Sequence, residues 1–222
     1  FVAAAAMTLI HYSRICEELV LWCSQSFNFI TLGDSFCTGS SMMPQKKNPD
    51  VPELIRGKSG RVVGHLMSLI TLMKSQPLSY NKDNQEDKEP LFDSVNTLLN
   101  CTRAIAELVP TMTIRSDVMA TAAEEGYITA TDIADHLVRK GISFRDAHET
   151  VGEIVKLAIA SNRKLEELTL KEFATISSDL DESIFDVLDP NKALSARNHF
   201  GGTAPNQVKD ACNRALERVK NL

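Results

Sequence analysis

The sequence predicts an all-α fold, in which part of a long central helix bundle is followed by a small helical domain. Three observations support this prediction. Long segments repeat apolar residues with a helical period, no stretch alternates with period two for long enough to predict a strand, and helix-start signals recur through the second half. We expect the bundle domain, truncated at its N-terminus, at 1–115 and the small helical domain at 116–222.

The bundle domain is expected to contain three long helices, separated by a loop and a polar turn. The helices are predicted at 1–28, 53–74 and 90–110, the loop at 29–52 and the turn at 76–89. No capping residue precedes the first helix, so we expect the chain to start inside a longer reading frame. Gly57, Gly60 and Gly64 would let another helix approach the second one closely. A loop as long as 29–52 inside a compact domain is usually functional.

Shorter helices with local start signals are predicted in the second half. Hydroxyl side chains that can cap a helix precede each apolar run, and a glutamate three residues later completes one capping box. The signals lie at Thr129, at Ser143, at Thr169 with Glu172, and at Thr203 with Pro205.

The composition excludes several classes of protein. The 222 residues are 43% hydrophobic and carry a net charge of −5 with both signs mixed, so a basic surface for nucleic acid or an anionic membrane is not expected. No segment approaches the length of a membrane span. The five cysteines are scattered, which indicates reduced thiols in a cytoplasmic protein and neither a disulfide framework nor a zinc site. We expect no metal and no other cofactor.

The most informative segment is Gly39-Ser40-Ser41-Met42-Met43-Pro44-Gln45-Lys46-Lys47-Asn48-Pro49. It combines a glycine hinge with hydroxyl, ammonium and carboxamide groups, and it runs into the start of the predicted second helix. Backbone N–H groups at a helix N-terminus favour an anion, with Lys46 or Lys47 as its charge partner. An ordinary surface loop with solvated lysines explains the composition equally well.

This segment resembles the signature G-S-S-x-M-P-x-K-x-N-P of the fumarase/aspartase superfamily at every fixed position. The resemblance implies a trans elimination that releases fumarate or a close relative. It also implies that Ser40 removes the proton beside a carboxylate, while Lys46 and Asn48 hold that carboxylate. Such a reaction builds a doubly charged aci-carboxylate, which fixed donors can stabilise by about 3–4 kcal/mol each. Ser41 is interpreted as a loop residue.

Two further segments are similar to the argininosuccinate lyase family, whose members cleave argininosuccinate to arginine and fumarate in arginine biosynthesis. The segment from Pro77 to Phe92 contains the run Q-E-D-K-E-P-L-F, and the resemblance implies that Tyr80, Gln85 and Lys88 contact the substrate. Gly201-Gly202-Thr203-Ala204-Pro205 resembles another run of that family. From the residues alone, the first segment reads as a solvated charged turn. The alternatives are another fumarate-releasing lyase, such as adenylosuccinate lyase, and a non-catalytic helical assembly module.

The resemblance also implies that the site is incomplete in one chain. Glu53 is expected to orient a catalytic histidine of another segment. From the residues alone, Glu53 forms a capping box with Asp50, and the two roles are compatible. That histidine belongs to an upstream T-H-L-x-x-A-Q-P run, and none of the five histidines here has those neighbours. The family assembles homotetramers in which three chains contribute to each site, so we expect this chain alone to be inactive.

Overall fold

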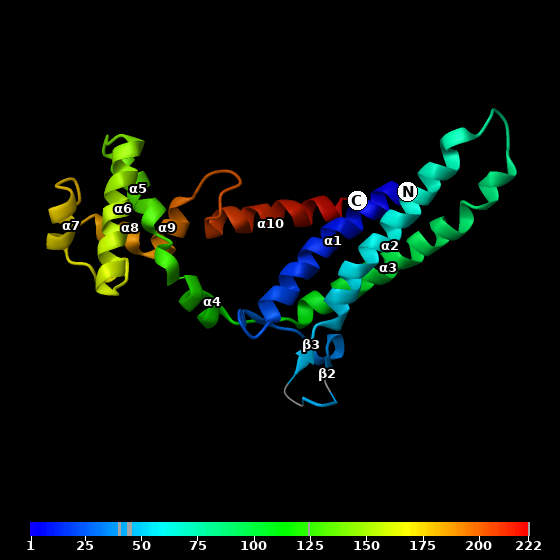
Figure 1. Ribbon diagram of the computed structural model, residues 1–222, viewed down its shortest axis with the longest axis horizontal. Helices are drawn as coiled ribbons and strands as arrows, with labels where there is room; N and C mark the ends of the chain where they lie inside the picture. Colours follow the sequence, from blue (N-terminus) through cyan, green and yellow to red (C-terminus); the bar gives the residue numbers. More distant parts are fainter. Residues whose placement is uncertain (40, 44–45, 124, 222) are drawn as a thin grey trace. The chain divides into compact units, whose positions relative to one another are not determined.

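The computed structural model describes residues 1–39, 41–43, 46–123 and 125–221, and its chain is built mainly from α-helices (Figure 1). The predicted all-α class is confirmed. The chain divides into two compact units, Phe1–Met119 and Ala120–Leu222.

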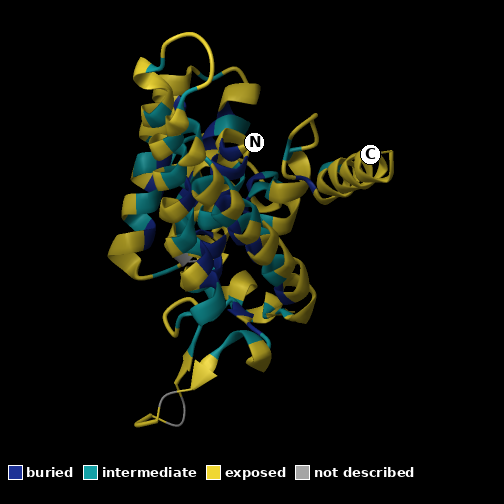
Figure 2. Cartoon of the chain, turned by 90° about the vertical axis from the view of Figure 1, so that its right-hand side faces the viewer, coloured by how far each residue is buried: buried dark blue, intermediate teal, exposed yellow. Residues whose placement is uncertain are grey.

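Three long helices form the body of the first unit: α1 (Val2–Cys23), α2 (Asp50–Leu72) and α3 (Lys88–Leu108). The buried residues of α1 recur every three or four positions, which places one apolar stripe against its neighbours. The core that the helices share consists of Val2, Ala5, Ala6, Leu9, Cys16, Ile55, Val62 and Cys101. Figure 2 shows buried segments in dark blue inside the bundle and exposed segments in yellow outside it.

Short strands order the segment that was predicted as a loop. β1 (Ile30–Thr31) pairs with β4 (Thr113–Ile114), and β2 (Thr38–Gly39) pairs with β3 (Lys47–Asn48), both antiparallel. The 3-10 helix η1 (Asp34–Phe36) lies between β1 and β2. A second apolar core of Leu19, Ile30, Leu32 and Leu108 anchors this region to the ends of α1 and α3. The loop is therefore held at its base.

The predicted polar turn joins α2 to α3 through two further 3-10 helices, η2 (Met73–Ser75) and η3 (Lys82–Gln85). Gln76 spans the turn, because its amide donates to the Leu72 carbonyl at 3.2 Å and to Asn84 Oδ1 at 3.1 Å. After α3, η4 (Val109–Thr111) leads into β4. α4 (Ser116–Ala123) follows.

The second unit packs short helices around its own apolar core. The helices that contribute buried residues to this core are α5 (Ala130–Arg139), α6 (Phe144–Ser161), α7 (Leu170–Ile176) and α8 (Ile184–Leu188). The 3-10 turns η5 (Glu125–Tyr127) and η6 (Leu165–Glu167) belong to the same unit. α9 (Pro190–Ala196) and α10 (Pro205–Lys220) follow and contain no buried residues. Phe173, Ile133, Leu137, Ile154 and Ile184 lie fully buried at the centre of this core.

Local start signals correspond closely to the observed helices. The Ser143 hydroxyl accepts from the Asp146 amide at 3.2 Å, and Thr169 with Glu172 forms the predicted capping box. Several boundaries differ from prediction. α1 ends at Cys23, α2 spans Asp50–Leu72 and α3 spans Lys88–Leu108, while Ala204 instead of Thr203 occupies the N-cap of α10. Across the described part of the chain, no helix is both long enough and apolar enough to cross a membrane.

Candidate active site

The signature segment forms a hairpin whose base is ordered. Thr38 pairs with Asn48 and Gly39 with Lys47, and the Lys46 amide donates to the Met43 carbonyl at 3.0 Å. Lys46 is exposed and Asn48 half-buried. Figure 2 shows the hairpin as an exposed projection from the unit. Ser40, the predicted base, lies outside the described residues, as do Pro44 and Gln45, so its geometry stays a prediction.

An ion pair joins the hairpin to the segment before it. The Lys47 ammonium donates to Asp34 Oδ1, and this hydrogen bond raises the pKa of Lys47 above its ordinary value. Asp34 opens η1, directly after Gly33. A Cβ on Gly33 would lie 2.7 Å from Thr111 Oγ1, so only glycine allows this approach of the chain before η1 to η4. The two consecutive lysines of the signature are thus in different environments.

The hairpin runs directly into the N-terminus of α2. The helix begins at Asp50 after the N-cap Pro49, and the Glu53 amide donates to the Pro49 carbonyl at 3.1 Å. The predicted capping box of Asp50 with Glu53 is wrong, because Asp50 is already inside the helix and no side chain caps it. Glu53 is exposed in the first turn. The positive end of the helix therefore lies beside Lys46 and Asn48, where an anion is favoured.

Two cysteines lie close to the hairpin base. Cys23 and Cys37 line a cavity of about 90 Å³ together with Lys47 and Pro49. Burial raises the pKa of both thiols above the ordinary value. Because the thiolate is the reactive form of cysteine, neither is suited to act as a nucleophile at neutral pH.

The second predicted group of residues lies on the turn between α2 and α3. The Tyr80 side chain is 66% exposed, and Gln85 and Lys88 are exposed as well. The Lys88 ammonium donates to the Asn84 carbonyl at 3.0 Å and pairs with Asp87, so it is tied to its own turn. These three side chains are available to a ligand approaching from outside the unit.

One chain does not bring the two groups together. The signature hairpin precedes the first residue of α2 and the Tyr80 turn follows its last (Figure 1). A straight helix of 23 residues is roughly 35 Å long, far beyond the reach of any side chain. Lys46 and Asn48 therefore cannot contact a ligand that is bound by Tyr80, Gln85 and Lys88 of the same chain.

Sequence reasoning missed a polar cluster that joins α2 to α3 between these two groups. Asp93 Oδ2 lies 2.7 Å from both His65 Nε2 and Arg61 Nε, and Arg61 makes a second contact to Asp93 Oδ1 at 2.5 Å. Burial raises the pKa of Asp93, but the hydrogen bonds from His65 and Arg61 outweigh it and the pKa is lowered. The only sequence signal was Arg61 four residues before His65, which puts both on one helix face. This cluster fixes how α2 lies against α3.

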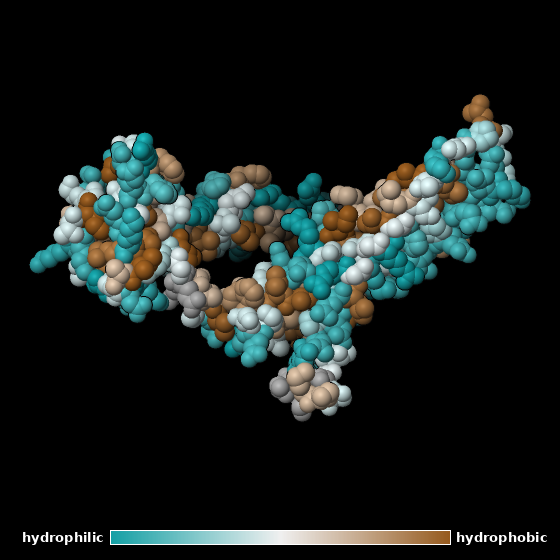
Figure 3. Space-filling view, in the orientation of Figure 1, coloured by the Kyte–Doolittle hydropathy of each residue, from teal (hydrophilic) through white to brown (hydrophobic). Residues whose placement is uncertain are grey.

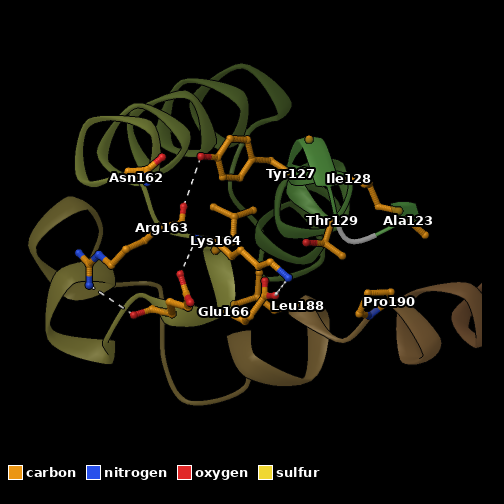
Figure 4. Close-up of a pocket in the computed structure, with 13 residues that line it drawn as sticks. Ala123, Tyr127, Ile128, Thr129, Asn162, Arg163, Lys164, Glu166, Leu188 and Pro190 are labelled. Atoms are coloured by element: carbon orange, nitrogen blue, oxygen red, sulfur yellow. Dashed lines mark hydrogen bonds and ion pairs between the residues drawn. The ribbon is translucent and has the colours of Figure 1, made fainter. Parts of the chain in front are cut away.

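The second unit contains a larger cavity of about 430 Å³ that is lined by none of the predicted catalytic or substrate-binding residues (Figure 4). Polar groups in its lining form hydrogen bonds and ion pairs within the unit. The Tyr127 hydroxyl donates to the Arg163 carbonyl at 3.3 Å, and Arg163 pairs with Glu172 at 2.5 Å. Among the described residues, no group of His, Cys, Asp and Glu could hold a metal ion. The signature hairpin remains the strongest candidate.

Comparisons with known proteins match both units. Residues 1–64 match the family model described as Lyase, and residues 127–195 match the model described as Argininosuccinate lyase C-terminal. An argininosuccinate lyase of Nitrosococcus oceani is 60% identical over 222 residues, which are 100% of this chain and 48% of that protein. One of Hahella chejuensis is 57% identical over 220 residues, 99% of this chain and 47% of that protein. The chain thus spans about half the length of the curated relatives it matches.

Solved structures show the same likeness. EDDS lyase in complex with formate superposes with a TM-score of 0.86 at 29% identity, covering 99% of this chain and 46% of that one. A structure described as fumarate lyase:delta crystallin from Brucella melitensis, bound to cobalt, gives a TM-score of 0.65 at 26% identity, covering 86% of this chain and 39% of that one.

Proposed function

Since this chain belongs to the argininosuccinate lyase family, we propose that the intact protein cleaves argininosuccinate into arginine and fumarate. The observation that carries the proposal is the signature hairpin, which presents Lys46 and Asn48 beside the N-terminus of α2. A cytoplasmic role in arginine biosynthesis follows from the same proposal.

The proposed reaction requires stabilisation of a carbanion next to a carboxylate. Ser40, as its alkoxide, takes the proton from that carbon, and the carbon–hydrogen electron pair forms the double bond of fumarate. The electron pair of the carbon–nitrogen bond leaves with the guanidino nitrogen, and the released arginine takes up one proton from water to become a guanidinium. Lys46 and Asn48 hold the carboxylate while its negative charge increases. The partial positive charge at the start of α2 acts on the same charge. Glu53, exposed in the first turn of α2, is available to orient a histidine that this chain does not contain.

The substrate is longer than fumarate and needs a second set of contacts. Tyr80, Gln85 and Lys88 are proposed to supply them from the turn between α2 and α3. Their exposure leaves the side chains accessible to a ligand held by another subunit. Because the ends of α2 are roughly 35 Å apart, each site combines the hairpin of one chain with the turn of another.

A homotetramer is the proposed assembly, and the surface of the first unit supports it. Large apolar side chains remain exposed on all three bundle helices: Met7, Ile10, Ile15, Leu21, Leu54, Met67, Ile70, Phe92 and Leu99. Figure 3 shows apolar surface along the bundle. An added Cβ on Gly57, Gly60 or Gly64 would meet nothing within 4 Å. This glycine face is therefore open to a helix of another copy.

The proposal is tested by following fumarate absorbance with the intact protein, first on argininosuccinate and then on adenylosuccinate. We expect turnover of argininosuccinate alone, and preference for the purine substrate would refute the assignment of Tyr80, Gln85 and Lys88. Ser40→Ala should reduce kcat by orders of magnitude while the assembly persists, and Ser41→Ala is the matched control that should retain most activity. Equal turnover by wild type and Ser40→Ala would remove Ser40 from the mechanism. This chain should be inactive by itself.

A further inference from the structure

We propose that the ion pair of Asp34 with Lys47 positions the hairpin, so that Lys46 and Asn48, and not Lys47, face the substrate. Lys47 is thus a positioning residue and not a substrate ligand. The inference rests on the proposed function, because it specifies which residues of that site reach the carboxylate.

The register of the hairpin is weakly determined by its backbone. Only two residue pairs, Thr38 with Asn48 and Gly39 with Lys47, form the ladder. Two paired residues on each strand are too few to fix a hairpin independently. A slip of one residue turns every side chain of a strand to the opposite face. Here a slip would exchange Lys47 with one of its neighbours, Lys46 or Asn48.

The sequence itself does not distinguish the two registers. Lys46 and Lys47 are adjacent and carry the same charge, so an anionic substrate attracts either one. Since neighbouring side chains in a strand point to opposite faces, Lys47 and Asn48 face opposite sides of the hairpin. The structure distinguishes the two registers, because only the observed one lets Lys47 donate a hydrogen bond to Asp34. Lys47 also lines the small cavity beside Cys37, toward the body of the unit.

Asp34 can determine the register because its own position is fixed. Gly33 lies against Thr111 without room for a side chain, and the Phe36 amide donates to the Gly33 carbonyl at 3.0 Å. Phe36 packs against the apolar core around Leu32. The Asp34 carboxylate therefore keeps its position even if the register of the hairpin changes.

The ion pair is exposed to solvent: 56% of the Lys47 and 84% of the Asp34 side chain are accessible. Exposed pairs add little to stability. Removing it should therefore leave the melting temperature nearly unchanged and act on the position of Lys46 and Asn48. A small displacement of groups that hold a substrate can lower turnover by about 100-fold.

The test compares Asp34→Asn, Lys47→Met, the double variant and Lys47→Arg in the intact, assembled protein. We expect each single neutral variant to lower kcat by about 10- to 100-fold, with a smaller change in KM. The double variant should lose no more than the worse single variant, because both changes break one interaction. Lys47→Arg retains the pair and should stay close to wild type. Lys192→Met, which breaks a similarly exposed pair with Asp186 in the second unit, is the matched control and should have no effect.

Two outcomes would overturn the inference. Turnover by Asp34→Asn equal to wild type shows that Asp34 does not position the hairpin. Additive losses in the double variant show that Lys47 acts on the substrate directly.

If wild type itself fails to cleave argininosuccinate, the proposed function is wrong. Hydrogen exchange of the Gly39 and Lys47 amides then tests the pair independently of activity: faster exchange in Asp34→Asn supports it, and unchanged exchange refutes it.

Discussion

We predict that each active site combines Lys46 of one subunit with Lys88 of another. Lys46 precedes α2 and Lys88 opens α3, with the whole of α2 between them. Lys46→Met and Lys88→Met each remove one ammonium group and retain the aliphatic stem. Either variant alone should be inactive, because every site then lacks one of the two groups. Co-expression of the two variants at equal levels should restore activity.

The expected recovery can be calculated from the geometry. In a randomly mixed oligomer, half of the hairpins and half of the turns are intact, and they come from different chains. About a quarter of the sites then combine an intact hairpin with an intact turn, so about 25% of wild-type turnover should return. If one chain supplied both groups, no site would be restored. The 23-residue length of α2 excludes that second case.

The assay is fumarate release by the co-purified mixture, compared with each variant expressed alone. A matched control combines Lys46→Met with Asn48→Ala. Both changes damage the hairpin, so mixing them leaves every site defective and should restore nothing. Absence of recovery in the first mixture, with mixed oligomers demonstrated by two affinity tags, would refute the separation of the two groups between chains.

Three further predictions concern assembly and stability. Gly60→Leu adds a side chain on the open face of α2, so it should weaken oligomerisation, measured by sedimentation, without unfolding the unit. Ile154→Ala removes a fully buried side chain and should lower the free energy of unfolding by about 2–5 kcal/mol in a urea titration. Hydrogen bonds from Arg163 and from the Thr169 amide and hydroxyl lower the pKa of Glu172 from 4.5 to about 2. This carboxylate therefore stabilises the fold above pH 4.5 and loses that effect as the pH falls toward 2. The melting temperature of Glu172→Gln should therefore lie below that of wild type at pH 6 and converge with it near pH 2.

Local chemistry made the helices of the second unit predictable. Ser143 and Thr169 each bind the backbone of the turn that follows, so a few adjacent residues determine where α6 and α7 begin. The short strands could not be predicted this way. β1 and β4 pair although most of the first unit's sequence lies between them. A strand of two residues is also too short to show an alternating pattern.

In the candidate site, too, some residues were predictable from local sequence and others depend on tertiary contacts. The signature segment predicted roles for Lys46 and Asn48 from their order in the chain, and in the structure both residues lie just before the start of α2. The partner of Lys47 was not predictable, because Asp34 lies 13 positions away and meets it only after η1 and the hairpin have formed. The cluster of His65, Arg61 and Asp93 depends in the same way on the packing of α2 against α3.

In the proposed mechanism, helix α2 is a spacer between two different active sites. Its N-terminus is proposed to stabilise charge at one site, and the turn after its C-terminus to recognise substrate at another. Inserting one residue would move the turn by about 1.5 Å and rotate it by about 100° relative to the hairpin, so the length of α2 is constrained by both sites together. The Asp93 cluster constrains the same geometry from the side, because it holds α2 to α3 midway between the two ends. Because an isolated chain keeps its two groups at this distance, the proposed mechanism predicts that activity depends on assembly.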